Sequence, residues 1–271
     1  MKYKLVLSDY DETLVPKDKE MSEYTLNAIK KYVKYGGKFV IASGRATKAL
    51  EIIMANLGLS GYIMAFNGSI VSDMQTGEIL VDLCLENENA INVCKAFEEK
   101  GYMPQLYDGD DVLFPYPTED SIAYEKRTKV AITYTGMPSS EYLKKTGKTT
   151  PKILVYVDPE KVNRKEFTDY FQSKFNDTND FLFTQSFLFE CINKKAGKGN
   201  AARALWEHLG LKKEEVLAFG DGMNDMQLLQ TVGKGVAVGN SCEELKAIAG
   251  EITLPCNEDG VAKYLEKIME E

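Results

Sequence analysis

The sequence has few of the residues that build disulfide-stabilised domains or zinc sites. It contains five cysteines and one histidine in 271 residues, and no two cysteines form a CxxC pair. A disulfide framework or a zinc site is therefore not expected, and the cysteines are interpreted as small buried hydrophobes. The one histidine, His208, falls near the carboxyl end of a predicted helix, where positive charge is mildly favoured, and it is not expected to be catalytic.

Long apolar runs and an excess of positive charge are also missing. No segment approaches the roughly 18 consecutive apolar residues that cross a bilayer. Lysine and arginine number 33 against 41 aspartates and glutamates, a formal net charge of −8. No strong basic field can collect nucleic acid or anionic lipid, so any phosphate must be bound by local groups. We therefore expect no nucleic-acid or membrane partner, and we expect the cytoplasm as the compartment.

The remaining composition is that of an ordinary globular protein, with 44% hydrophobic and 27% charged residues. The length exceeds one average domain and falls short of two, which favours a single large α/β domain or a core that carries an insert.

The first part of the chain alternates apolar runs with amphipathic stretches. Runs at 5–7, 38–42 and 62–66 predict buried parallel strands, and the periodic stretches 22–35 and 46–57 predict helices. This βαβαβ order is typical of a doubly wound, Rossmann-like parallel sheet. The segments SIVSD and EILVD, which follow, predict short antiparallel strands that leave this sheet.

The pattern loosens from about 84 to 191, and alternation of strands and helices resumes after it. We therefore predict an α/β core formed by 1–83 and 192–271, interrupted by an inserted α+β domain at 84–191. Within this insert, 136–151 is predicted to be an exposed, mobile loop. Further helices are predicted at 86–100, 159–174, 198–209, 223–231, 241–249 and from about 258, and further strands near 102–107, 111–115, 128–134, 151–157, 180–184, 187–192, 216–221, 235–239 and 251–255.

Two acidic clusters follow predicted strands, which is where ligands bind in open parallel sheets. DYDET places Asp9, Asp11 and Thr13 after the first strand, and GDGMND begins its cluster with Asp221. Two carboxylates two residues apart can act as nucleophile and as acid and base if their surroundings separate their pKa values. Alone, the first pattern also fits a solvated acidic turn. Carboxylates at the ends of neighbouring strands repel unless a cation lies between them, and an all-oxygen set with room for water suits magnesium.

Two other motifs could bind an anion. Ser43 and Gly44 follow the strand at 38–42 and offer a hydroxyl and backbone N–H groups at the start of a helix. Lys198 lies in AGKGNA, where flanking glycines let its ammonium group approach a ligand, and a point charge suits phosphate.

Two neighbours of these motifs are ambiguous. Arg45 could clamp a substrate, or it could form a surface or interdomain salt bridge. Asn67-Gly68 could border the site, although a plain turn is the favoured interpretation. Aromatic residues of the insert are expected to serve mainly in packing, with one or two in contact with substrate.

Taken in order, DYDET, ASGR, AGKG and GDGMND resemble the four motifs of the haloacid dehalogenase superfamily, and specifically its Cof-type phosphatases with a large inserted cap. The resemblance covers essentially the whole chain. It implies that Asp9 is the nucleophile and a magnesium ligand. It also implies that Asp11 is the general acid and base with its carbonyl on the metal, and that Asp221 is the other carboxylate on the metal.

The same resemblance assigns the supporting residues. Phosphate binding falls to Ser43, Gly44, Lys198 and Asn224, and Thr13 and Asp225 support the site. Lys194 and Lys195 compete with Lys198 for the role of the lysine, but the adjacent glycine favours Lys198.

The predicted function is a magnesium-dependent phosphatase that hydrolyses a small phosphorylated metabolite, such as a sugar phosphate or a phosphorylated cofactor, through an aspartyl-phosphate. Asp11 argues against dehalogenation, because a leaving halide needs no proton. A phosphomutase of the same superfamily and a phosphate-ligand-binding protein without turnover remain as alternatives. The insert is expected to select the substrate, and the chain is expected to be a monomer or a weak homodimer.

Overall fold

The computed structural model describes residues 1–17, 19–109, 111–128 and 130–270. They form two compact units, which we call the core (Met1–Val81 with Gly197–Glu271) and the insert (Asp82–Ala196). The predicted insert at 84–191 lies within the second unit.

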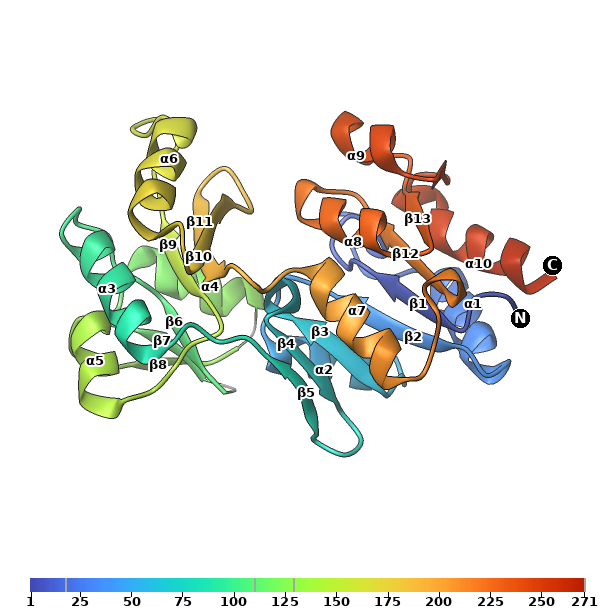
Figure 1. Cartoon of the computed structure of the whole chain (residues 1–271), viewed down its shortest axis with the longest axis horizontal. Coiled ribbons are helices and arrows are strands. Elements are labelled where there is room, and N and C mark those ends of the chain that lie inside the picture. The colour runs from blue at the N-terminus through green and yellow to red at the C-terminus, as the bar shows by residue number, and fades with distance from the viewer. Residues whose placement is uncertain (18, 110, 129, 271) are drawn as a thin grey trace. The chain divides into compact units, whose positions relative to one another are not determined.

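The core is built on a sheet with the strand order β14-β13-β12-β1-β2-β3-β4-β5 (Figure 1). The central strand β1 pairs in parallel with β2 on one side and β12 on the other. Because the chain continues outward in both directions from β1, the strand order reverses at its carboxyl end, where open α/β sheets bind ligands. The strands are β1 (Leu5–Ser8), β2 (Lys38–Ala42), β3 (Tyr62–Ala65), β4 (Ile70–Asp73), β5 (Ile79–Asp82), β12 (Val216–Gly220), β13 (Lys234–Ala237) and β14 (Glu251–Ile252).

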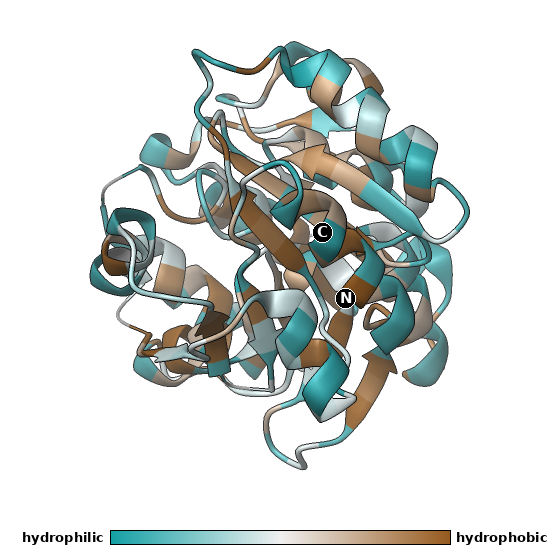
Figure 2. Cartoon of the chain, turned by 90° about the vertical axis from the view of Figure 1, so that its left-hand side faces the viewer, coloured by the Kyte–Doolittle hydropathy of each residue, from teal (hydrophilic) through white to brown (hydrophobic). Residues whose placement is uncertain are grey.

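Both faces of this sheet are covered by helices, which explains the continuous apolar run in β1. Leu5 and Leu7 pack in the hydrophobic cluster that includes Ala202 and Leu205 of α7, while α1 packs against α10. Figure 2 shows the same tendency over the whole chain, with strands that are largely brown and helices that carry both brown and teal residues. The helices are α1 (Glu23–Lys34), α2 (Thr47–Asn56), α7 (Lys198–His208), α8 (Met226–Thr231), α9 (Glu243–Ile248) and α10 (Gly260–Glu270).

The prediction that SIVSD and EILVD leave the sheet is wrong. A tight turn, η1 (Phe66–Gly68), returns the chain beside β3, so that β4 pairs antiparallel with β3 and β5 extends the same edge. This pairing buries Ile70 and Val71, which would be exposed if the segment left the sheet.

The insert contains two sheets among the described residues, with strand orders β10-β11-β9 and β6-β7-β8. Its hydrophobic core is rich in phenylalanine, and the rings of Phe97 and Phe171 lie 4.4 Å apart between centroids. The elements are α3 (Asn87–Glu98), β6 (Leu106–Asp108), β7 (Asp111–Phe114), α4 (Glu119–Thr128), β8 (Ile132–Tyr134), α5 (Ser139–Thr146), β9 (Ile153–Tyr156), α6 (Arg164–Phe175), β10 (Asn179–Phe183) and β11 (Leu188–Asn193).

Sequence patterning missed α4, and it placed a strand at 128–134 where β8 begins only at Ile132. Thr128 ends α4, and residue 129 lies outside the described residues. The helix is polar along most of its length, and this gives periodicity little to detect.

The predicted loop at 136–151 contains the helix α5, so this prediction is wrong for its middle part. Gly147 ends the helix in the left-handed conformation, with φ of 69°. Leu143 is 1% exposed, and Ser140 donates a hydrogen bond to Glu98 of α3 over 2.5 Å. The segment looked like a loop because its serines, lysines and threonines outnumber the few side chains that pack.

We predict that Leu143→Ala lowers the free energy of unfolding by about 2–5 kcal/mol, because it deletes a buried side chain of α5. The control is Lys145→Ala on the exposed side of the same helix, for which a change within about 0.5 kcal/mol is expected. Denaturant unfolding of both variants gives the comparison, and equal small effects would restore the interpretation of 136–151 as an exposed loop.

Candidate active site

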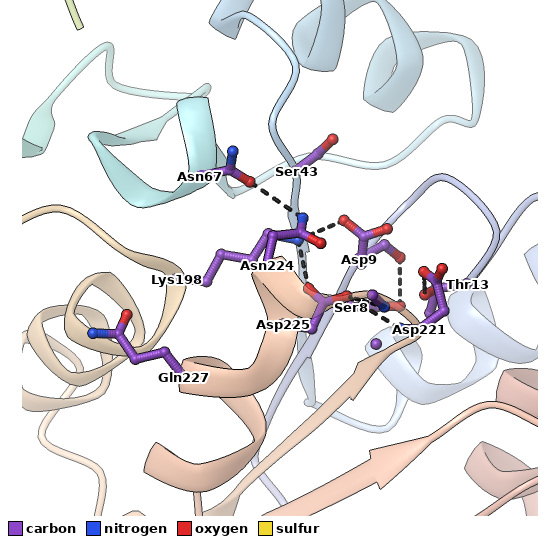
Figure 3. A network of polar contacts seen from close by, with 12 residues as sticks. Ser8, Asp9, Thr13, Ser43, Asn67, Lys198, Asp221, Asn224, Asp225 and Gln227 are labelled. Atoms are coloured by element: carbon purple, nitrogen blue, oxygen red, sulfur yellow. Dashed lines mark hydrogen bonds and ion pairs between the residues drawn. The ribbon is translucent and has the colours of Figure 1, made fainter. Parts of the chain in front are cut away.

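The loops that follow β1, β2, β3 and β12 meet at one edge of the core sheet. Ser8 is in register with Phe219 of β12 and Ile41 of β2, so these strands end at the same level. The Asp9 N–H donates to the Phe219 carbonyl over 3.1 Å, and the Ser43 N–H donates to the Met64 carbonyl of β3 over 2.9 Å. Parallel pairing therefore gathers residues that are more than 200 positions apart in the sequence (Figure 3).

At the centre lies a buried lysine shared by two carboxylates. The Lys198 Nζ atom is 2.5 Å from Asp9 Oδ1 and 2.6 Å from Asp225 Oδ1, and the Lys198 and Asp225 side chains are 0% exposed. Such a group is costly to break, because removing one partner leaves a buried charge uncompensated. The competing lysines lie elsewhere: both Lys194 and Lys195 are exposed, and Lys194 donates to the Asn176 carbonyl in the insert.

A third carboxylate, that of Asp221, lies close to those of Asp9 and Asp225. Oxygens of Asp9, Asp221 and Asp225 lie within 4.8 Å of one another. Burial raises the pKa of Asp9 well above its usual value; Lys198 opposes this shift, and the neighbouring carboxylates add to it. Burial also raises the pKa of Asp221 to about 7, although Thr13, which donates to Asp221 Oδ1 over 2.6 Å, lowers it.

Burial is the main cause of these pKa shifts, and repulsion between the neighbouring carboxylates adds to it. Burial lowers the pKa of Lys198, but the carboxylates of Asp225 and Asp9 outweigh it and raise that pKa, so the lysine stays charged. With all three carboxylates ionised, one ammonium leaves the group net negative. A divalent cation with oxygen ligands would complete the balance, and the all-oxygen donor set fits magnesium.

Asp225 is held on every side. Its Oδ2 accepts the N–H groups of Asp221 and Gly222 over 3.1 and 3.2 Å, while its Oδ1 is occupied by Lys198. Gly220 gives it room, since a Cβ there would lie 2.5 Å from that of Asp225. Asp225 therefore fixes the loop that carries Asp221 and orients the lysine.

Asp11 stands apart from the buried group. Its carboxylate accepts two hydrogen bonds from Arg45, over 2.9 and 2.7 Å, and its side chain is 55% exposed. The Arg45 guanidinium also lies over the Tyr10 ring, 5.2 Å from the centroid. Of the two possibilities left open for Arg45, the structure shows a salt bridge within the core, with Asp11 as its partner.

The predicted phosphate-binding residues surround Asp9. Ser43 is buried, and its hydroxyl accepts the Arg45 N–H over 3.2 Å. Asn224 donates its Nδ2 to Asn67 Oδ1 over 3.3 Å, which brings the loops after β12 and β3 together. Asn67 is thus part of this site as well as of a turn. A polar residue directly after a parallel strand was the signal for it, and the Asn-Gly dipeptide, usual in plain turns, obscured that signal.

His208, the one histidine of the chain, is the last residue of α7. Its Nε2 lies 3.1 Å from the hydroxyl of Tyr62 on β3, outside the group around Asp9.

Comparison with known proteins decides the family. The model of the haloacid dehalogenase-like hydrolases matches residues 6–265, nearly the whole chain. This chain belongs to that family. The four-motif resemblance seen in the sequence is thereby confirmed at the level of family and fold.

Individual relatives are similar to this chain over nearly their whole length. The chain is 28% identical to an HMP-PP phosphatase of Yersinia enterocolitica over 97% of this chain and 94% of that protein. It is 25% identical to the phosphatase YwpJ of Bacillus subtilis, covering 98% and 100%. A crystal structure of a haloacid dehalogenase-like hydrolase from Bacteroides thetaiotaomicron superposes with a TM-score of 0.88 at 26% identity, covering 98% and 100%.

The raised pKa of Asp221 predicts how metal-free protein responds to pH. Because the folded pKa near 7 lies above the unfolded value of about 4, the folded state loses stability as pH rises between them. Asp221→Asn removes this loss and still accepts the Thr13 hydrogen bond. We predict that the variant's Tm gains on the parent as pH rises from 5 to 8 in chelator, and that magnesium reverses the order at pH 8. A pH-independent difference in Tm would contradict the raised pKa of Asp221.

Proposed function

We propose that this chain is a magnesium-dependent phosphatase that hydrolyses small phosphorylated metabolites, such as a sugar phosphate or a phosphorylated cofactor, through an aspartyl-phosphate on Asp9. The observation that carries the proposal is the buried Lys198 shared by Asp9 and Asp225, with Asp221 beside them. The relative named an HMP-PP phosphatase, at 28% identity over nearly the whole chain, supports the same class of reaction.

The chemistry follows from charge. A carboxylate that attacks a phosphate monoester brings negative groups together, so positive charge must lie at the phosphoryl oxygens. Lys198 supplies one such charge next to the attacking group, because its Nζ already lies 2.5 Å from Asp9 Oδ1. The hydroxyl of Ser43 and the amide of Asn224 add neutral donors around the same position.

The proposed reaction has two steps on the protein's own groups. In the first, an Asp9 oxygen forms a bond to phosphorus, the ester P–O bond breaks, and Asp11 gives its proton to the leaving oxygen. In the second, Asp11 takes a proton from water as the water oxygen attacks phosphorus, the Asp9–phosphorus bond breaks, and phosphate leaves. Asp9 and Asp11 return to their starting states.

Magnesium would be held by the carboxylates of Asp9 and Asp221 and by the Asp11 carbonyl. When bound, it supplies Lewis-acid stabilisation of the charge on the transferred phosphoryl group. Both Asp11 oxygens accept hydrogen bonds from Arg45 in this structure, so Asp11 would have to leave this salt bridge to carry and deliver the proton.

We propose that the insert selects the substrate and that the core performs the transfer. The insert's hydrophobic core is separate from that of the core unit, so its surface can vary without disturbing the group around Asp9. Among the described residues no helix has the length and apolar content needed to cross a bilayer. A small metabolite in the cytoplasm is the proposed substrate.

We predict that Asp9→Asn abolishes turnover of p-nitrophenyl phosphate in magnesium while the fold is retained, because an amide cannot form the acyl phosphate. Wild-type activity should vanish in excess chelator and return with magnesium better than with calcium, which relaxes the compact geometry that in-line attack needs. The matched control is Asp177→Asn, an exposed aspartate of the insert. Asp9→Asn activity within about tenfold of the parent would contradict the nucleophile assignment.

We predict that Asp11→Asn slows hydrolysis of an alkyl phosphate by about 10²–10⁴-fold, the usual worth of general acid and base catalysis. The loss should be smaller for p-nitrophenyl phosphate, whose leaving group needs little protonation. Steady-state rates of both substrates test this. Equal losses would show that Asp11 does not protonate the leaving group.

A further inference from the structure

Asn67 carries a buried donor that nothing in the described residues satisfies. The residue is 4% exposed, and its Oδ1 accepts a hydrogen bond from Asn224, yet its Nδ2 has no hydrogen-bond acceptor among the described residues. Figure 3 shows Asn67 beside the group around Asp9, with its amide oxygen turned toward Asn224 and its nitrogen turned away from it. Buried N–H groups without an acceptor are uncommon and destabilising, so this one calls for a reason.

The backbone holds Asn67 in place. Phe66 and Asn67 both have positive φ, of 51° and 54°, a conformation that asparagine tolerates and that phenylalanine rarely adopts. The Asn67 N–H donates to the Ser43 carbonyl over 3.0 Å, and the Phe66 N–H donates to the Arg45 carbonyl over 3.0 Å. The turn is therefore locked onto the loop that carries Ser43.

The turn also packs closely against Gly197, the residue before the helix that begins with Lys198. Gly68 follows with φ of 90°, and a Cβ there would lie 2.6 Å from the carbonyl oxygen of Gly197. On the other side, a Cβ on Gly44 would lie 3.1 Å from the Asn67 Nδ2. The amide is thus fixed between the two segments from which phosphate-binding residues are predicted.

A purely conformational role does not account for this placement. An asparagine that serves only to tolerate positive φ can leave its amide in solvent. Here the amide is buried, oriented by Asn224, and short of an acceptor. We propose that the Asn67 Nδ2 donates a hydrogen bond to a non-bridging oxygen of the phosphoryl group bound beside Asp9, and that Asn224 positions it. The inference rests on the proposed function, to which it adds a phosphate-binding residue.

The test compares two variants with a charge-matched control. Asn67→Asp keeps the shape and the tolerance of positive φ but replaces the donor by an acceptor. Asn67→Gly keeps the backbone and removes the amide. The control, Asn27→Asp, places the same new charge on an exposed residue of α1. Each protein is saturated with magnesium and measured for competitive inhibition by inorganic phosphate and for the phosphate-induced rise in Tm, which needs no turnover.

Loss of one hydrogen bond to a charged group weakens binding by about ten- to a hundredfold. We expect the phosphate inhibition constant to rise by about tenfold or more in Asn67→Gly and further in Asn67→Asp, with the phosphate-induced Tm rise reduced and the magnesium requirement unchanged. Asn27→Asp should behave as wild type.

Two results would count against the proposal in different ways. If both Asn67 variants bind phosphate as wild type does and lose only basal Tm, Asn67 is a structural residue, and the proposed function stands without it. If the wild-type protein in magnesium neither binds phosphate nor turns over p-nitrophenyl phosphate, the proposed function fails, and this inference fails with it.

Discussion

The imbalance between three buried carboxylates and one lysine is the constraint on which the site depends. Lys198 contacts Asp9 and Asp225 directly, and Asp221 lies close to both, so the group with all three carboxylates ionised is net negative without a further cation. Burial is the main cause of the raised pKa values of Asp9 and Asp221, and the neighbouring carboxylates add to it. A site of this kind is prepared for a divalent cation, and the proposed nucleophile is already in contact with the positive charge that would neutralise a phosphoryl oxygen.

The fold supplies this arrangement through the order of its strands. β1 lies between β2 and β12, so one edge of the sheet collects side chains from the beginning, the middle and the end of the core sequence. Close-packed glycines then allow the loops to meet, as at Gly220 against Asp225 and Gly68 against Gly197. The close packing of Gly68 against Gly197, next to Lys198, also holds the neighbouring Asn67 in place. A turn residue therefore lies within the site.

Strand ends were predictable from the sequence, because a buried apolar run followed by a polar cluster marks the carboxyl end of a parallel strand. That rule placed Asp9 and Asp221 at one edge. It could not show that Asp11 turns toward Arg45, since side-chain direction in a loop leaves no periodic signal. It undervalued Asn67 because Asn-Gly is common in plain turns. Helix α5 was missed because Leu143 is among the few apolar residues of a polar segment. The role of the insert in choosing a substrate stays a prediction.

The central claim is that Asp9 accepts the phosphoryl group. Mixing the magnesium-loaded protein with substrate, quenching it in acid within the first turnover, and locating the modified peptide by mass spectrometry tests this directly. The account predicts a phosphoryl group on Asp9 in the wild-type protein, accumulating further in a variant that lacks Asp11, and none in Asp9→Asn. Turnover without a protein-bound phosphoryl group, or a phosphoryl group on another residue, would contradict it.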